Sequence, residues 1–184
     1  MYRTIVEESQ QHVAVMDVFS KLIQERIIFI DGIIDDDLAN GVIAQMLYLS
    51  AVNGDREISI YINSPGGQVT AGLAIYDVAK LIKTPIKTVC IGQAASMGCI
   101  LMLMGTERCG LTHSRFMLHQ VSGGVVGTFE DMKINLEEAQ KAQNAIYKII
   151  KEKTFLKSID DELKFDKWFG SEEALEANII TKIL

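Results

Sequence analysis

Three residues of this 184-residue chain have the side-chain types that together hydrolyse an acyl bond: a serine, a histidine and an aspartate. The serine, Ser96, lies in a run of small residues, Gly92–Gly98, between a β-branched segment and an apolar one. A serine at the start of a helix most often caps the first turn, but it can also be a nucleophile beside free N–H groups. Ala94–Gly98 matches the nucleophile-elbow pattern G-x-S-x-G, with Ala at the first position. Ser96 is therefore a candidate nucleophile that needs partners.

The candidate partners are His119 and Asp166. His119 ends a short predicted strand, and Asp166 lies among aromatic residues, where a carboxylate needs a partner such as a histidine N–H. An isolated histidine is more often structural than catalytic. Together, however, these residues supply a nucleophile, a base and an orienting carboxylate, the groups that serine hydrolysis requires. The backbone N–H groups of Gly67 and Met97 are suitable donors to the oxyanion.

The elements that must position these residues alternate between strand and helix. Sequence patterns predict strands at 26–30, 57–62 and 86–91, followed by helices at 38–51, 70–83 and 99–104 respectively. This order predicts an α/β domain with parallel strands and crossover helices. Asp31–Gly32 is typical of a turn and Asn63–Gly67 of a loop. We expect the strand-to-helix loops, which carry Gly67 and Ser96, to open at the carboxyl ends of neighbouring strands, where such sheets bind ligands.

The length predicts a single domain, and the patterning divides it into four parts. Residues 1–16 have no steady period and predict a mobile N-terminal arm, and residues 17–127 predict an α/β head. Residues 128–153 predict one amphipathic helix of about 40 Å, at ~1.5 Å per residue. We expect this helix to protrude and to pack on another subunit; the alternative is a helix that covers the core. Residues 154–184 complete the head.

The composition limits the partners and the location. A net charge of −6 disfavours binding to nucleic acid or to an anionic membrane surface, and no apolar run approaches the ~20 residues that span a bilayer. Three cysteines without C-x-x-C spacing indicate buried thiols in a reducing compartment and give no sign of a zinc site. We therefore expect a cytoplasmic protein. We also expect neither a metal nor another cofactor. Asp35–Asp37 could bind a cation, but it is more typical of the acidic first turn of a helix.

Several motifs, taken in order along the chain, resemble those of one family. Tyr61–Gly67, Gly92–Gly98 and Met117–Gln120 are similar to segments of the proteolytic subunit of the Clp protease. Asp166 with Ser171–Ala174 is similar to that family's aspartate segment. The resemblance runs across nearly the whole chain, and it implies a serine endopeptidase whose chemistry is independent of ATP.

The resemblance also implies roles for individual residues. It assigns Ser96, His119 and Asp166 to the catalytic triad and makes Gly67 and Met97 the oxyanion donors. It implies that extended substrate lies as an added strand between two backbone segments. Those segments comprise Gln68, Val69 and Thr70, which follow Gly67, and on the other side Ser122, Gly123, Gly124 and Val125.

At the level of assembly, the resemblance implies a crotonase-like ββα superhelix and self-association into heptameric rings, usually stacked in pairs through the helix at 128–153. It implies a separate AAA+ unfoldase that delivers unfolded polypeptides, because this chain lacks a G-x-x-x-x-G-K-[ST] loop of its own. A second Clp peptidase paralogue is a further expected partner.

The chain departs from the family's pattern at several positions. Val121 stands where the family has a proline, Lys164–Phe165 replaces an acid–arginine pair, and Ser59 replaces an aromatic residue of the cleft to which the unfoldase docks. Two other functions therefore stay open. One is a catalytically weak or inactive regulatory ring subunit of a mixed Clp assembly. The other is a crotonase-type acyl-CoA enzyme, which would share the fold and the oxyanion donors.

Overall fold

Isoleucine-rich strands form the centre of the protein. The computed structural model describes residues 4–8 and 13–184, and its main sheet has seven strands in which all neighbours but one pair are parallel. Five strands follow one another in the order β3 (Ile27–Ile34), β4 (Ile58–Gly67), β5 (Ile86–Ala95), β6 (Glu107–Gly110) and β9 (Lys182–Ile183). Beyond the end of β6, β7 (Arg115–Leu118) pairs with β5, and β8 (Lys167–Phe169) pairs antiparallel with β7.

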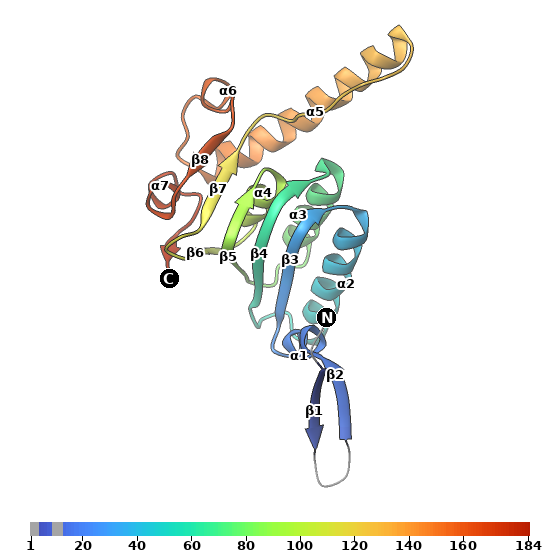
Figure 1. Cartoon of the computed structure of the whole chain (residues 1–184), viewed down its shortest axis with the longest axis vertical. Coiled ribbons are helices and arrows are strands. Elements are labelled where there is room, and N and C mark those ends of the chain that lie inside the picture. Colours follow the sequence, from blue (N-terminus) through green and yellow to red (C-terminus); the bar gives the residue numbers. More distant parts are fainter. Residues whose placement is uncertain (1–3, 9–12) are drawn as a thin grey trace.

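Helices connect the parallel strands and cover the sheet (Figure 1). They are α2 (Asp36–Val52) after β3, α3 (Val69–Leu81) after β4 and α4 (Met97–Met102) after β5. The side chains of Ile30, Ile60 and Ile62 are completely buried between strands and helices. Each such side chain contributes about 1.5–3 kcal/mol relative to an exposed one. The predicted α/β class, with parallel strands and crossover helices, is confirmed.

The central strands run further than their β-branched segments. β3 continues through Asp31–Gly32 and β4 continues through Asn63–Gly67, so the predicted turn and the predicted loop are wrong. The register shifts once between Asp31 and Ile33 and once between Ile62 and Ser64. The glycines and the proline are accommodated at these irregularities, and the pairing of β4 with β3 and β5 continues beyond them. As a result Gly67, a candidate oxyanion donor, is the last residue of β4 and not part of a loop.

The acidic triplet begins a helix. Asp35 is the N-cap of α2, and its carboxylate accepts a hydrogen bond from the Leu38 N–H at 2.9 Å. Asp36 and Asp37 occupy the first turn, where negative charge interacts favourably with the helix dipole. The helix-start interpretation of Asp35–Asp37 is thus confirmed.

The N-terminal residues form a hairpin. β1 (Thr4–Glu8) pairs antiparallel with β2 (Val13–Asp17), and the hairpin projects from the sheet next to α1 (Val18–Gln24) (Figure 1). The irregular spacing of apolar residues gave no sign of this pairing. Part of the arm predicted at 1–16, namely residues 1–3 and 9–12, lies outside the described residues. Its mobility stays a prediction.

The longest helix is α5 (Phe129–Lys153), which begins at a capping box formed by Thr128 and Asp131. Only Ile146 and Ile150 of this helix are buried. Figure 1 shows the chain after β7 running along α5 to its far end, where the helix begins and returns. The helix α6 (Ile159–Glu162) then leads to β8.

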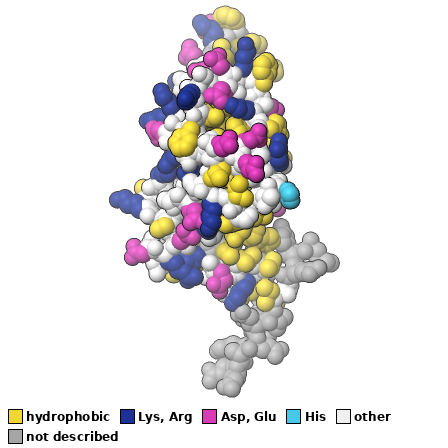
Figure 2. Space-filling model, turned by 90° about the vertical axis from the view of Figure 1, so that its left-hand side faces the viewer, with side chains coloured by type: hydrophobic (Ala, Val, Ile, Leu, Met, Phe, Trp, Pro, Cys, Tyr) yellow, Lys and Arg dark blue, Asp and Glu magenta, His cyan; other side chains and the backbone are white. Residues whose placement is uncertain are grey.

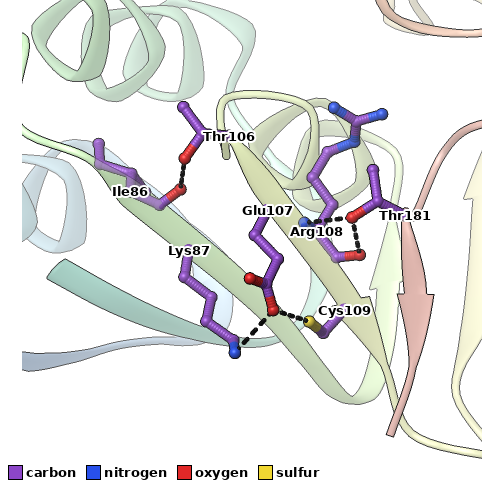
Figure 3. A network of polar contacts seen from close by, with 7 residues as sticks. All are labelled: Ile86, Lys87, Thr106, Glu107, Arg108, Cys109 and Thr181. Carbon is purple, nitrogen blue, oxygen red and sulfur yellow. Dashed lines mark hydrogen bonds and ion pairs between the residues drawn. The ribbon is translucent and has the colours of Figure 1, made fainter. Parts of the chain in front are cut away.

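A polar network holds the C-terminal segment on the sheet after α7 (Ser171–Glu176) (Figure 3). The guanidinium of Arg108 donates to the carbonyl oxygens of Ile179 and Asn178 at 3.0 and 2.8 Å. The backbone N–H of Arg108 donates to Thr181 Oγ1 at 3.0 Å. These bonds satisfy a largely buried cation and fix the C-terminal segment against β6.

The cysteines of β5, α4 and β6 are free and buried. Burial raises the pKa of Cys109 to about 11, and it also raises the pKa of Cys90 and Cys99. Since thiolate is the reactive form and becomes abundant only as pH rises through the pKa, we expect no modification of the native protein by iodoacetamide at pH 8. Mass spectrometry should find three modified thiols only after unfolding; rapid native labelling would contradict this prediction.

Charges of both signs are interspersed on the surface. On the face shown in Figure 2, which carries β8, α6 and α7, basic and acidic side chains alternate and no extended basic field is visible. Among residues 4–8 and 13–184, no helix has the length and apolar character needed to cross a membrane.

Candidate active site

Ser96 occupies a strained turn between β5 and α4. Its backbone has φ 52° and ψ −124°, a conformation that costs a non-glycine residue about 1–3 kcal/mol. The Ser96 N–H donates to the Met117 carbonyl at 2.9 Å, which holds the turn against β7. Although Ser96 is the N-cap residue of α4, its side chain makes no capping hydrogen bond. The capping interpretation of this serine is therefore wrong.

Glycine in the neighbouring strand makes room for that turn. Gly66 has φ +100°, and a Cβ built on it would lie 2.6 Å from Ser96 Cβ and 2.8 Å from the Ala95 carbonyl oxygen. Such contacts are too short for any real side chain, and the positive φ also favours glycine. Gly66 thus permits the close approach of β4 to the serine turn.

Strand register places His119 beside Ser96. In the parallel pair of β5 and β7, Ala95 lies opposite Met117, so both chains leave the sheet at the same edge. His119 Nε2 lies 2.8 Å from Ser96 Oγ, within hydrogen-bond distance. The sequence pattern proposed this pair, and the ends of two adjacent strands bring its members together.

The next strand brings Asp166 to the same edge. Leu118 of β7 lies opposite Lys167 of β8, so the following residue of one strand faces the preceding residue of the other. Asp166 Oδ1 is 3.8 Å from His119 Nδ1, which is an ion-pair distance but too long for a hydrogen bond. The Asp166 side chain is 63% exposed, so the prediction that aromatic residues bury this carboxylate is wrong. The neighbouring Phe165 is itself exposed and gives the carboxylate no apolar cover.

A small cavity of about 50 Å³ opens beside the serine. Gly67 and Met97, the predicted oxyanion donors, both line it together with Ser96 and His119. The rest of the wall comes from α3, α4, β7, the segment after β7 and α5; its apolar side chains include Val69, Ile100, Leu118 and Ile146, and Gln120 and Ser122 are polar. The cavity can therefore hold an apolar group next to the serine oxygen.

The two segments predicted to bind substrate have different backbones. Gln68 is extended, but α3 begins at Val69, so the main chain of Val69 and Thr70 is helical. Helical N–H and C=O groups point along the helix axis and cannot pair with an extended peptide as a strand does. The predicted strand edge therefore does not extend to Val69 and Thr70. On the other side, residues 122–125 are exposed and lie outside any strand, so their backbone is accessible.

Sequence reasoning missed the contribution of α5 to the site. Ile146 lines the cavity at Ser96, although its helical spacing indicated only packing. One turn earlier, the Oε1 atom of Gln143 accepts a hydrogen bond from the Val121 N–H at 2.6 Å. Nothing in the local sequence distinguishes Gln143 from the other polar residues of this helix.

The arrangement has the parts of a nucleophilic hydrolase. A base within 2.8 Å of a hydroxyl can remove its proton, and a nearby carboxylate can stabilise the imidazolium that forms. Gly67 and Met97 line a small cavity, and backbone N–H groups directed into such a cavity can stabilise negative charge on a bound carbonyl oxygen. A family model described as Clp protease matches residues 9–184 of the chain.

Proposed function

Since the chain belongs to the Clp protease family, we propose that it is a serine endopeptidase in which Ser96, His119 and Asp166 form the catalytic triad. The observation that carries this proposal is the 2.8 Å distance between Ser96 Oγ and His119 Nε2. The absence of a capping hydrogen bond supports it, because the Ser96 hydroxyl is not engaged by the backbone of α4.

In the proposed reaction His119 Nε2 takes the proton of Ser96 as Oγ attacks the scissile carbonyl. The N–H groups of Gly67 and Met97 donate to the oxyanion that forms. The imidazolium then gives its proton to the leaving amine, and water repeats the sequence to release the acyl group. The apolar part of the cavity wall, which includes Val69, Ile100 and Ile146, favours an apolar substrate side chain next to the scissile bond.

We propose that the substrate is an unfolded polypeptide delivered by an AAA+ unfoldase. The extended backbone at Gly67–Gln68 and the exposed backbone of residues 122–125 are suited to pair with an extended peptide. We also infer a crotonase-like superhelix, which the alternation of strands and helices supports. The proposed location is the cytoplasm, consistent with three unpaired cysteines.

We infer that the subunit assembles into heptameric rings that stack in pairs through α5, with a second Clp peptidase paralogue as a further ring partner. Support comes from the N-terminal half of α5, which exposes several large apolar side chains. A cluster of exposed apolar side chains is typical of a surface that contacts another protein. Those of α5 are Phe129, Met132, Ile134 and Leu136. Burial of these side chains by a second subunit would stabilise the assembly.

The long His119–Asp166 distance predicts a modest role for the carboxylate. Without a hydrogen bond, and with Asp166 largely exposed, the carboxylate acts on the imidazolium only through a screened charge interaction. We expect Asp166→Ala to lower kcat/KM for a fluorogenic peptide by about tenfold to hundredfold. A loss of ~10⁴-fold or more would show that the carboxylate closes to a hydrogen bond in the working enzyme, and would contradict this prediction.

The same distance favours a second candidate function, a catalytically weak or inactive regulatory ring subunit of a mixed Clp assembly. One experiment separates the two functions. Native mass and hydrolysis of fluorogenic peptides are measured for the wild type and for Ser96→Ala, each alone and with a partner peptidase subunit whose own serine has been replaced. A proteolytic subunit predicts rings whose hydrolysis disappears with Ser96→Ala. Rings that never hydrolyse peptide would favour the regulatory subunit, and monomers at every concentration would contradict the assembly.

A further inference from the structure

The segment that follows His119 lies between two cavities. The small cavity at Ser96 is on one side, and a larger cavity of about 320 Å³ lies on the other side, against α5. Gln120 and Val121 line both cavities. Val121 packs partly against the hydrophobic core, but the two cavities leave the rest of the segment with fewer packing contacts than a core strand has. Directed contacts therefore add to what this partial packing fixes.

One such contact joins the segment to the long helix. The Val121 N–H donates to Gln143 Oε1 at 2.6 Å, across 22 positions of sequence. Figure 1 shows why this pair can meet, since the chain after β7 runs along α5. The bond fixes the main chain two residues after His119, the candidate base.

The residue type at position 121 makes this bond possible. A proline has no N–H and could not donate to Gln143. Val121 stands where the resembling family has a proline, so this chain has a donor that the family's pattern lacks. The valine therefore replaces the stiffness of a proline ring with a hydrogen bond to another element.

The amide nitrogen of Gln143 is in an energetically unfavourable position. Its Nε2 atom is buried without a hydrogen-bond partner, and so is the hydroxyl of Tyr147, one turn later. Burial raises the pKa of Tyr147. The side-chain amides of Gln120 and Gln143 lie near the phenol and partly oppose this rise in pKa. Neither amide makes a well-formed hydrogen bond to the phenol oxygen. An unpaired buried donor is unfavourable. The glutamine keeps this position nonetheless, with its oxygen towards Val121.

We propose that Gln143 is a positioning residue for the catalytic base. By accepting the Val121 N–H it holds the segment after β7, and so holds His119 Nε2 in reach of Ser96 Oγ. The inference rests on the proposed roles of Ser96 and His119. Gln143 itself does not contact the reacting atoms, and its effect passes through the main chain of Val121.

The test is a double-mutant cycle that measures the second-order rate constant for labelling of Ser96 by a fluorophosphonate. Its four proteins are the wild type, Gln143→Met, Val121→Pro and the double variant. Methionine is close in size to glutamine but cannot accept this bond. We expect Gln143→Met to slow labelling about tenfold. In the Val121→Pro background the donor is already absent, so Gln143→Met should have no further effect.

Two comparisons control for packing. Val121→Ala retains the N–H, so Gln143→Met should still slow labelling about tenfold in that background. Gln140→Met alters the wall of the same outer cavity, but Gln140 donates to Asn144 and not to the loop, so it should label at the wild-type rate. A wild-type rate for Gln143→Met, or equal effects of Gln143→Met in the Val121→Pro and Val121→Ala backgrounds, would overturn the proposal.

Hydrogen exchange gives a readout that does not depend on activity. Peptides that contain the Val121 amide should exchange faster in Gln143→Met than in the wild type, whereas Gln140→Met should leave their rate unchanged. Unchanged exchange in Gln143→Met would overturn the positioning role even if labelling fell. A wild type that is never labelled would contradict the proposed function as well, whereas normal wild-type labelling with an unaffected Gln143→Met contradicts this inference alone.

Discussion

His119→Ala is expected to lower kcat for peptide hydrolysis by a factor of ~10⁴–10⁶. The imidazole lies 2.8 Å from the serine oxygen, and no other described histidine is near enough to replace it as base. Without the imidazole, Ser96 is a neutral alcohol and therefore a weak nucleophile. KM should change little, because the rest of the cavity wall remains. Steady-state hydrolysis of a fluorogenic peptide measures both constants.

His113 provides the matched control for this substitution. It is exposed and lines a different cavity, near the end of β6, so His113→Ala removes the same side chain without touching the serine. We expect wild-type kinetics for this control. A loss in His113→Ala comparable to that in His119→Ala would contradict the assignment of the base.

Gly66→Ala is expected to lower kcat/KM by about 100-fold without removing any catalytic side chain. A Cβ at this position would lie 2.6 Å from Ser96 Cβ, so either β4 or the serine turn must move. A displacement of the nucleophile by ~1 Å is sufficient for a loss of this size. The strained φ and the steric overlap should also reduce the free energy of unfolding by about 1–3 kcal/mol. Peptide kinetics and thermal unfolding measure the two effects.

Gly32→Ala separates strain from steric overlap. Gly32 also has a positive φ, +76°, but a Cβ there would meet nothing within 4 Å. We expect Gly32→Ala to lower stability by about 1 kcal/mol and to retain the reactivity of Ser96. If the two alanine variants lost activity equally, backbone strain rather than contact with Ser96 would be the cause.

The sequence was informative where local chemistry decides the structure. Alternating strand and helix patterns predicted the α/β class, and carboxylates at Asp35–Asp37 predicted the start of α2, because dipole and capping effects act within one turn. The pairing of Ser96 with His119 was also predictable from motifs. The reason that they meet, the register of β5 with β7, is a long-range property that local patterns do not contain.

The incorrect predictions also concern long-range properties that local sequence patterns do not contain. Local composition misleads for Asp166, since aromatic residues that neighbour it in sequence need not surround the carboxylate in space, and here the carboxylate is exposed. Asn63–Gly67 looked like a loop because glycine and proline normally end a strand, but neighbouring strands on both sides keep part of it paired. Gln143 could not be identified because its partner, Val121, is 22 residues away.

The most direct test of the central claim is the site of covalent modification. The assembled protein is treated with a fluorophosphonate, and the adduct is located by mass spectrometry of its peptides. We expect one adduct per subunit, on Ser96, and none in Ser96→Ala or in wild type unfolded before treatment. Absence of an adduct on Ser96 in every assembled state, or labelling of other serines at the same rate, would contradict it.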